Sequence, residues 1–234
     1  MLRLYGNDDA GSVTELPGFG EGQWWVQDLA ASLPARLIPQ DAADVLDLCA
    51  APGGKTMQLA AAGHRVTAVD QSESRLKRLS ENLDRTGLKA RLVTGDATKW
   101  EPDRQFYAIL LDAPCSATGT FRRHPEVLYR GSPRIIRDSA EMQARLLARA
   151  ASWVKPGGAL VYSVCSLEPD EGEAIVRRFL EQNRAYAVTP PAPGELPDFV
   201  TSSPEGWVRI LPGLLETEGG LDGFFAVRLV RTAG

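Results

Sequence analysis

The sequence predicts an α/β protein in which a mostly parallel sheet carries helices on both faces. Short apolar runs rich in β-branched residues recur along the chain, and helical segments separate most of them, which is the pattern of βαβ units. The chain has 234 residues and is 44% hydrophobic, which is enough to bury one full core. We expect strands at residues 44–48, 65–70, 90–94, 106–112 and 159–165, and a last strand at 222–230.

Helices are indicated by apolar spacing and by residues that begin or end a helix. The clearest one follows the second strand, where Ser72 is a candidate N-cap, leucines repeat on one face and Gly87 closes the helix. A longer helix is predicted at 134–153 and a short one at 24–37. Residues 189–206 contain five prolines and indicate a surface loop.

The composition favours a reduced, cytoplasmic protein without a membrane partner. No run approaches the roughly 18 apolar residues of a membrane span, and the opening MLRLYGNDDAG has neither the charged nor the apolar region of a signal peptide. The three cysteines form no C-x-x-C pair and no zinc pattern, and their odd number argues against a disulfide framework. We therefore expect free thiols and no metal site.

The stretch CAAPGGKT, residues 49–56, resembles a phosphate-binding loop but lacks essential parts of one. In the template G-x-x-x-x-G-K-[ST], Cys49 stands where the first glycine belongs, and Pro52 removes a backbone N–H donor. The dinucleotide pattern G-x-G-x-x-G fails as well, because alanines replace the early glycines. A strand, a turn of small residues and a helix remain, and this combination lets a nucleoside approach the backbone closely.

Acids follow three successive strands, and ligands of open parallel sheets lie beyond these strand ends. Asp70 stands about 20 residues after the glycine turn, where a carboxylate can accept both ribose hydroxyls. Asp96 could accept a hydrogen bond from an adenine amino group, and Asp112 ends the fourth strand. Three acids suit a sugar, an amine-bearing base and a cation, so we expect S-adenosylmethionine (SAM). Each Asp alone could instead be a turn residue, and Lys55 could pair with the methionyl carboxylate or only cap the loop.

Two cysteines are predicted to lie close together. Cys115 follows the fourth strand and Cys165 ends the fifth, and in the usual methyltransferase order these strands are neighbours about 4.8 Å apart. A thiol beside SAM suits methylation of cytosine at carbon 5, because that carbon takes a methyl group only after a thiolate has added to carbon 6. A second group near the adduct then serves the elimination. The alternative is that either cysteine is a small buried hydrophobe.

Six motifs occur in a specific order between about residues 16 and 229: DLCAAPGGKT, AVD, GDATKW, LLDAPCSATGTFRRHPE, LVYSVCSLEPDEGE and DGFFAVRL. They resemble the NOL1/NOP2/Sun family of RNA cytosine-5 methyltransferases, closest to the bacterial 16S ribosomal RNA enzymes of the Sun type. The resemblance implies the Rossmann-like fold of SAM-dependent methyltransferases, with a mostly parallel seven-stranded sheet. It implies that Cys165 attacks the base and that Cys115 assists release, whereas DNA cytosine methyltransferases attack with the Pro-Cys cysteine. The implied SAM-binding residues are Cys49, Ala50, Ala51, Pro52, Gly53, Gly54 and Lys55, with Asp70, Asp96 and Asp112.

The chain departs from the family pattern in three respects. Ala117 replaces the glycine of the usual Ser-Gly-Thr-Gly stretch, and this replacement matters only if the position needs a positive φ. Val164, directly before Cys165, replaces a common threonine. Relatives of the Sun type carry an N-terminal helical RNA-binding domain, so the chain is either a short natural form or a catalytic fragment. We divide it into a loop and helix segment, 1–43, packing on a SAM-dependent methyltransferase catalytic domain, 44–234. Asp112 keeps a second possible role at the cytosine edge.

Basic residues gather at 121–150, where seven arginines face three acids in a chain of net charge −4. A solvated helix face would explain this cluster equally well, but the resemblance favours phosphate contacts. The candidates are Arg122, Arg123, His124, Arg130, Arg134 and Arg137. We expect a monomeric RNA (cytosine-5-)-methyltransferase acting on ribosomal RNA. The alternatives are a non-catalytic RNA-binding ribosome assembly factor, a methyltransferase of transfer RNA, and one acting on a protein or small molecule.

Overall fold

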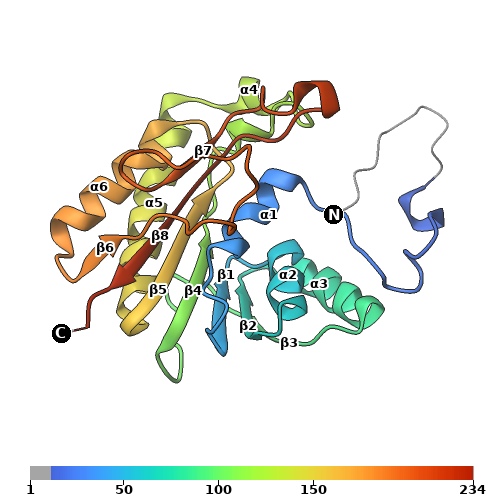
Figure 1. The fold of residues 1–234 in the computed structure, drawn as a ribbon, viewed down its shortest axis with the longest axis horizontal. Coiled ribbons are helices and arrows are strands. Elements are labelled where there is room, and N and C mark those ends of the chain that lie inside the picture. The colour runs from blue at the N-terminus through green and yellow to red at the C-terminus, as the bar shows by residue number, and fades with distance from the viewer. Residues whose placement is uncertain (1–11, 234) are drawn as a thin grey trace.

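A sheet of eight strands forms the centre of the computed structural model, which describes residues 12–233 (Figure 1). The strand order is β3-β2-β1-β4-β5-β8-β6, and β7 pairs with β8 off this path. Strands β1 to β5 are parallel, whereas β8 is antiparallel to β5, β6 and β7. The strands are β1 Asp44–Leu48, β2 Arg65–Asp70, β3 Ala90–Thr94, β4 Phe106–Asp112, β5 Val154–Val164, β6 Tyr186–Val188, β7 Val208–Ile210 and β8 Phe224–Arg231.

Helices cover both faces of this sheet. Side chains of β4 alternate between two core clusters, with Ile109 and Leu111 packing toward α5 and α6, and Ala108 and Leu110 toward α1 and α2. The third helix, α3, packs on the same face as α2. In Figure 1, α2 and α3 lie at the β3 end of the sheet and α6 at the β6 end. The α-helices are α1 Leu29–Arg36, α2 Gly54–Ala61, α3 Glu73–Thr86, α4 Val127–Arg130, α5 Pro133–Ser152 and α6 Glu173–Gln182.

Every predicted strand is present, although two boundaries and the total number differ. β5 begins at Val154, before the predicted residue 159, because the chain stays extended through Pro156 and pairs irregularly opposite Phe106. The predicted last strand is shifted to Phe224–Arg231. Two further strands, β6 and β7, have three residues each and make the sheet eight-stranded in the described chain instead of seven-stranded. Such short runs are too brief to show a period in the sequence.

The predicted helices are present, and one of them begins later than expected. The helix at 24–37 is confirmed only as α1, because the Asp28 side chain accepts the N–H of Ala30 at 2.9 Å and caps the helix there. Ser72 and Gly87 bound α3 as predicted, and Gly87 has a φ of 66°. Residues 189–206 contain no helix or named strand.

The N-terminal part of the described chain packs on the sheet through α1. Ala30 and Leu33 share a core cluster with Ile210 and Phe224. Residues 1–11 and Gly234 lie outside the described residues, and so does the stretch on which the expectation of no signal peptide rests. Among residues 12–233, no helix is long and apolar enough to cross a bilayer.

Candidate active site

The predicted site residues follow the carboxyl ends of the parallel strands. β1 lies between β2 and β4. The chain leaves β1 toward β2 and β3 on one side and later returns to β4 and β5 on the other, so the strand order reverses at β1. Open α/β sheets bind their ligands beyond the strand ends at such a switch point. Cys49 follows β1, Asp70 ends β2, Asp96 follows β3, Asp112 ends β4 and Cys165 follows β5.

The turn after β1 depends on small residues. Cys49 and Gly53 have φ values of 58° and 106°, and a Cβ on Gly53 would collide with the Leu79 side chain of α3. The N–H of Ala50 donates to the carbonyl of Val69 at 3.1 Å, which ties the turn to β2. Burial, reinforced by nearby carboxylates, raises the pKa of the Cys49 thiol to about 12. Cys49 is therefore a protonated residue of the turn.

Two of the three acids have different surroundings. Asp70 is buried and accepts the N–H groups of Ala51 (3.1 Å) and Ser72 (2.9 Å), so it holds the β1 turn against the start of α3. Asp96 keeps 40% of its side chain exposed and accepts the hydroxyl (2.7 Å) and N–H (2.9 Å) of Thr98. These hydrogen bonds lower the pKa of Asp96. Asp96 thus remains ionised and accessible.

Lys55 and Asp112 form an ion pair across the switch point. Lys55 Nζ lies 2.7 Å from Asp112 Oδ2 and 5.0 Å from the centre of the Phe224 ring. The other oxygen of Asp112 accepts the hydroxyl of Ser163 at 2.9 Å. From the sequence, Lys55 could either pair with the methionyl carboxylate or cap the loop. In the structure its ion-pair partner is Asp112.

The two thiols meet as expected from the strand order. β4 and β5 are neighbours with Asp112 opposite Ser163, and the sulfurs of Cys115 and Cys165 lie 3.5 Å apart. Both thiols are free and half-buried. The contact with Cys165, followed by burial and the charge of Glu171, raises the pKa of the Cys115 thiol well above its usual range. Cys115 therefore holds its proton tightly.

Close backbone approaches fix the segment that follows Cys115. The N–H of Gly119 donates to the carbonyl of Cys165 at 3.0 Å, and the N–H of Gly223 donates to the carbonyl of Gly119 at 2.7 Å. A Cβ on Gly119 would collide with the carbonyl of Gly223. Ala117 has a φ of 58°. The position therefore needs the left-handed conformation that glycine adopts more easily than alanine, so the replacement of glycine matters here.

A buried polar network lies next to the segments that carry the thiols, and no motif in the sequence indicates it. Its centre is Glu171, in the short helical turn Pro169–Glu171, and the side chain of Glu171 is fully buried. Glu171 accepts hydrogen bonds from Ser116, Ser166 and Gln143. In the sequence nothing distinguishes Glu171 from the acids around it, because its partners lie far away along the chain.

The basic candidates separate into two groups. Arg122 and Arg123 are paired with the buried Asp222, Arg123 through both oxygens, and Arg122 also contacts Asp28 at 3.0 Å. These two arginines thus have a structural role that the sequence did not indicate. The second group is exposed: His124 lies 3.4 Å from Glu126, Arg134 lies 3.7 Å from Asp138, and Arg130 and Arg137 have no ion pair among residues 12–233.

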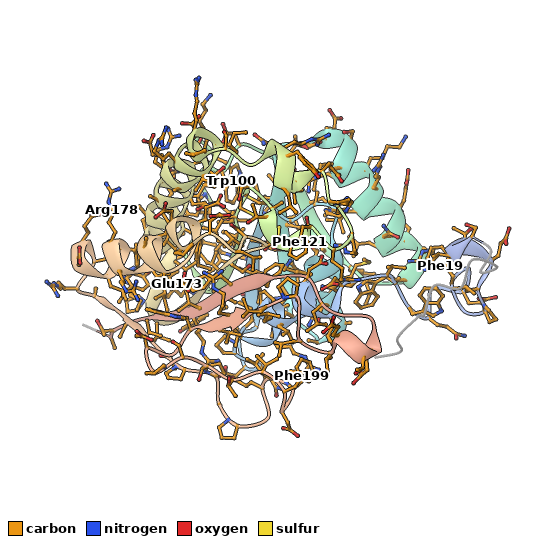
Figure 2. The ribbon with its side chains drawn as sticks, turned by 90° about the horizontal axis from the view of Figure 1, so that it is seen from above. Phe19, Trp100, Phe121, Glu173, Arg178 and Phe199 are labelled. Atoms are coloured by element: carbon orange, nitrogen blue, oxygen red, sulfur yellow. The ribbon has the colours of Figure 1, made fainter. Side chains whose placement is uncertain are left out.

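Figure 2 shows where two segments near the cysteines lie in the molecule. Phe121, in the segment between Cys115 and α4, lies over the middle of the molecule, and Glu173 and Arg178 lie on α6 to one side. Glu173 pairs with Arg209, which also donates to the carbonyl of Ser166 at 3.0 Å.

Between residues 12 and 233, no group of three or more His, Cys, Asp or Glu side chains could hold a metal ion.

A family model described as 16S rRNA methyltransferase RsmB/F matches residues 34–230. The chain belongs to this family. Two RsmB/F relatives, both named ribosomal RNA small subunit methyltransferase B, come from Salmonella arizonae and Salmonella paratyphi B. They are 42% and 41% identical over 94% of this chain. The chain spans about half the length of these relatives, 49% in each case.

Solved structures agree with this membership. NSun6 from Pyrococcus horikoshii has a TM-score of 0.82 and 29% identity, covering 96% of this chain and 57% of that one. A methyltransferase homologue from the same organism has a TM-score of 0.78, covering 95% and 73%. Magnesium protoporphyrin IX methyltransferase from Synechocystis, at 15% identity and a TM-score of 0.52, shares the fold alone, over 82% of this chain and 72% of its own. The predicted Rossmann-like fold of SAM-dependent methyltransferases is confirmed.

Proposed function

We propose that this chain methylates carbon 5 of cytosine in RNA, with SAM supplying the methyl group. The observation that carries the proposal is the 3.5 Å separation of the Cys115 and Cys165 sulfurs at the ends of neighbouring strands. Carbon 5 becomes reactive once a thiolate has added to carbon 6. A second thiol in contact with the first suits the elimination that follows. Membership of the RsmB/F family supports RNA as the substrate.

The residues around the β1 turn fit SAM. α2 begins at Gly54 without a side-chain cap, which leaves the first N–H groups of the helix available to the methionyl carboxylate. The exposed carboxylate of Asp96 has accepting capacity for an adenine amino group. Asp70 and Asp112 bring negative charge to the same strand ends, where a sulfonium and an α-amino group need it. We therefore propose that Cys49, Ala50, Ala51, Pro52, Gly53, Gly54 and Lys55 bind SAM with these three acids.

Cys165 is the proposed nucleophile, and Cys115 is the proposed assistant in product release. Cys165 Sγ, as the thiolate, would form a bond with carbon 6 of the base, and carbon 5 would then take the methyl group, whose bond to the SAM sulfur breaks to leave S-adenosylhomocysteine. Afterwards water would take the proton on carbon 5, and the bond to Cys165 Sγ would break with its electron pair returning to sulfur, which restores the thiolate. The raised pKa of Cys115 supports this division, because a thiol that holds its proton tightly is a poor nucleophile.

Ribosomal RNA is the proposed substrate, because the relatives are named for the small ribosomal subunit. The exposed residues His124, Arg130, Arg134 and Arg137 are the proposed phosphate contacts, whereas Arg122 and Arg123 would add contacts while paired with Asp222. Work on ribosomal RNA would place the protein in the cytoplasm, and we propose that it acts as a monomer. We further propose that segment 1–43 packs on the catalytic domain 44–234, which the contacts of α1 support.

Two cysteine variants test the mechanism with tritiated SAM and unmodified 16S ribosomal RNA. Cys165→Ala should lose methyl transfer by at least ~1000-fold, because it lacks the nucleophile, and it should still bind SAM. Cys115→Ala should accumulate a covalent RNA adduct, visible as a shifted band under denaturing conditions. RNA that already carries 5-methylcytidine is the control substrate. Full methylation by Cys165→Ala would contradict the assignment, and transfer to transfer RNA alone would correct the substrate.

A further inference from the structure

The carboxylate of Glu171 joins the two segments that carry the thiols. Its Oε1 accepts the N–H of Ser116 at 2.8 Å and the side-chain amide of Gln143 at 3.0 Å. Its Oε2 accepts the hydroxyls of Ser116 and Ser166, the latter at 2.5 Å. Ser116 and Ser166 each directly follow one cysteine. One buried side chain therefore reaches the residue next to each sulfur.

Further contacts strengthen this arrangement on both sides. Gln143, itself fully buried, also donates to the carbonyl of Pro114 at 3.0 Å, so the residues before and after Cys115 are both held. The Tyr162 hydroxyl donates to the carbonyl of Glu171 at 2.6 Å and fixes the backbone from which the carboxylate extends. The carboxylate of Glu171 is shielded from water, but its two oxygens accept four hydrogen bonds in place of those that water would donate.

We propose that Glu171 is a positioning residue that sets the separation of the Cys115 and Cys165 sulfurs by holding the serine after each cysteine. The proposal deepens the function proposed above, and rests on it for the chemical roles of the thiols. Its geometric part stands on the hydrogen bonds alone. A carboxylate is suited to this task because it accepts from both segments at once, with charge-assisted bonds.

The charge of Glu171 has a second effect, on the proton of Cys115. The ionisable groups facing Cys115 are Cys165, Glu171 and Tyr162. Burial raises the pKa of Tyr162 well above its usual range, so Tyr162 is neutral. Arg123, near Cys165, is held by Asp222, whose hydrogen bond raises the pKa of the Arg123 guanidinium. Glu171 thus disfavours a thiolate at Cys115, and this matches the division of labour between the two thiols.

Three variants separate the shape of Glu171 from its charge. Glu171→Gln keeps the shape of the side chain but removes its charge. The hydroxyls of Ser116 and Ser166 can rotate and accept hydrogen bonds from the new amide group. Glu171→Ala removes the connection between the segments. Asp170→Asn is the matched control, because Asp170 is the adjacent acid in the same helical turn and is exposed.

The first readout is the rate at which diamide joins the two thiols, measured by peptide mass spectrometry. Diamide takes two electrons and two protons from the thiols and becomes the hydrazine, while the sulfurs form a disulfide. Glu171→Ala should slow this reaction at least ~10-fold, since a misplacement of about 1 Å costs that much or more. Asp170→Asn should react like the wild type, and Glu171→Gln at least as fast. An unchanged rate in folded Glu171→Ala would overturn the proposal.

The second readout is alkylation of Cys115 by iodoacetamide as a function of pH. Glu171→Gln should move its midpoint to lower pH, because the repelling charge is gone, and a merely structural role would leave it in place. If Glu171→Ala does not fold, Ser166→Ala removes the hydroxyl that donates to Glu171 from the Cys165 side, together with its contacts to Ser116, Thr118 and the N–H of Glu168. This variant should also slow diamide oxidation, and an unchanged rate would refute the connection.

Neither thiol readout needs RNA or SAM. Should the wild type transfer no methyl group, the proposed function fails while the geometric role of Glu171 is still decided by the thiols. Where transfer occurs, Glu171→Ala should lower kcat and leave KM for RNA and SAM unchanged, because the defect lies in the thiol geometry and not in binding.

Discussion

Asp47 should make the stability of this protein fall as pH rises, and Asp47→Asn should remove that dependence. Asp47 lies in β1 and is fully buried. One of its oxygens accepts the hydroxyl of Thr56 at 2.6 Å, and the other has no hydrogen-bond partner among residues 12–233. Burial raises the pKa of Asp47 from 3.8 to about 7, and the hydrogen bond from Thr56 only partly opposes this.

The sign and size of the effect follow from linkage. Between pH 3.8 and about 7 the native state holds a proton at Asp47 that the unfolded chain has lost. The free energy of unfolding therefore decreases by up to about 1.4 kcal/mol per pH unit in this window, or about 2 kcal/mol between pH 5 and pH 7, where Asp47 is half ionised in the native state. Above pH 7 the loss levels off, because Asp47 is then ionised in both states.

Urea unfolding at pH 5, 6, 7 and 8 measures this effect as the difference between Asp47→Asn and the wild type. The other titrating groups cancel in the difference, which should rise by about 3 kcal/mol from pH 5 to pH 8 in favour of the variant. Asp41→Asn, at an exposed acid just before β1, is the control and should give a flat difference. Parallel curves for Asp47→Asn, within about 0.5 kcal/mol, would refute the reasoning.

Two further predictions concern the turn after β4 and the basic surface. Ala117 occupies a left-handed conformation, so Ala117→Gly should raise the free energy of unfolding by about 1 kcal/mol, measured by urea denaturation; a decrease would show that the φ of 58° is not strained. Arg130→Ala and Arg137→Ala should each lower the slope of log affinity for RNA against log salt by about 0.7–0.9 in a binding titration. Arg78→Ala, at an exposed position of α3, should leave the slope unchanged, and equal slopes for all three variants would contradict phosphate contacts.

The features predictable from sequence were those with a local signal. Apolar runs located the strands, and the rule that parallel strands end at one edge brought Cys115 and Cys165 together before any coordinates. The start of α1 was wrong because periodicity extended the helix back past Asp28, where the cap actually begins it. Helix ends depend on one hydrogen bond, which a periodic pattern does not resolve.

The features that escaped prediction are contacts between residues far apart in the chain. Glu171 reaches Ser116 across 55 positions, and Arg123 reaches Asp222 across 99. Such pairs leave no trace in spacing or composition, because each residue alone resembles an ordinary surface charge. For this reason the arginine cluster was interpreted as uniform, although two of its members are tied to a buried carboxylate.

The hydrogen bond between Gly119 and Gly223 has a consequence for how the protein is made. Both cysteines are translated well before Gly223, yet the segment between Cys115 and Gly119 gains its last backbone partner only from that late residue. On a translating ribosome, this bond can form only after Gly223 has left the exit tunnel, although both cysteines and Glu171 have emerged before it. The segment after Cys115 therefore receives this contact only when the start of β8 is made.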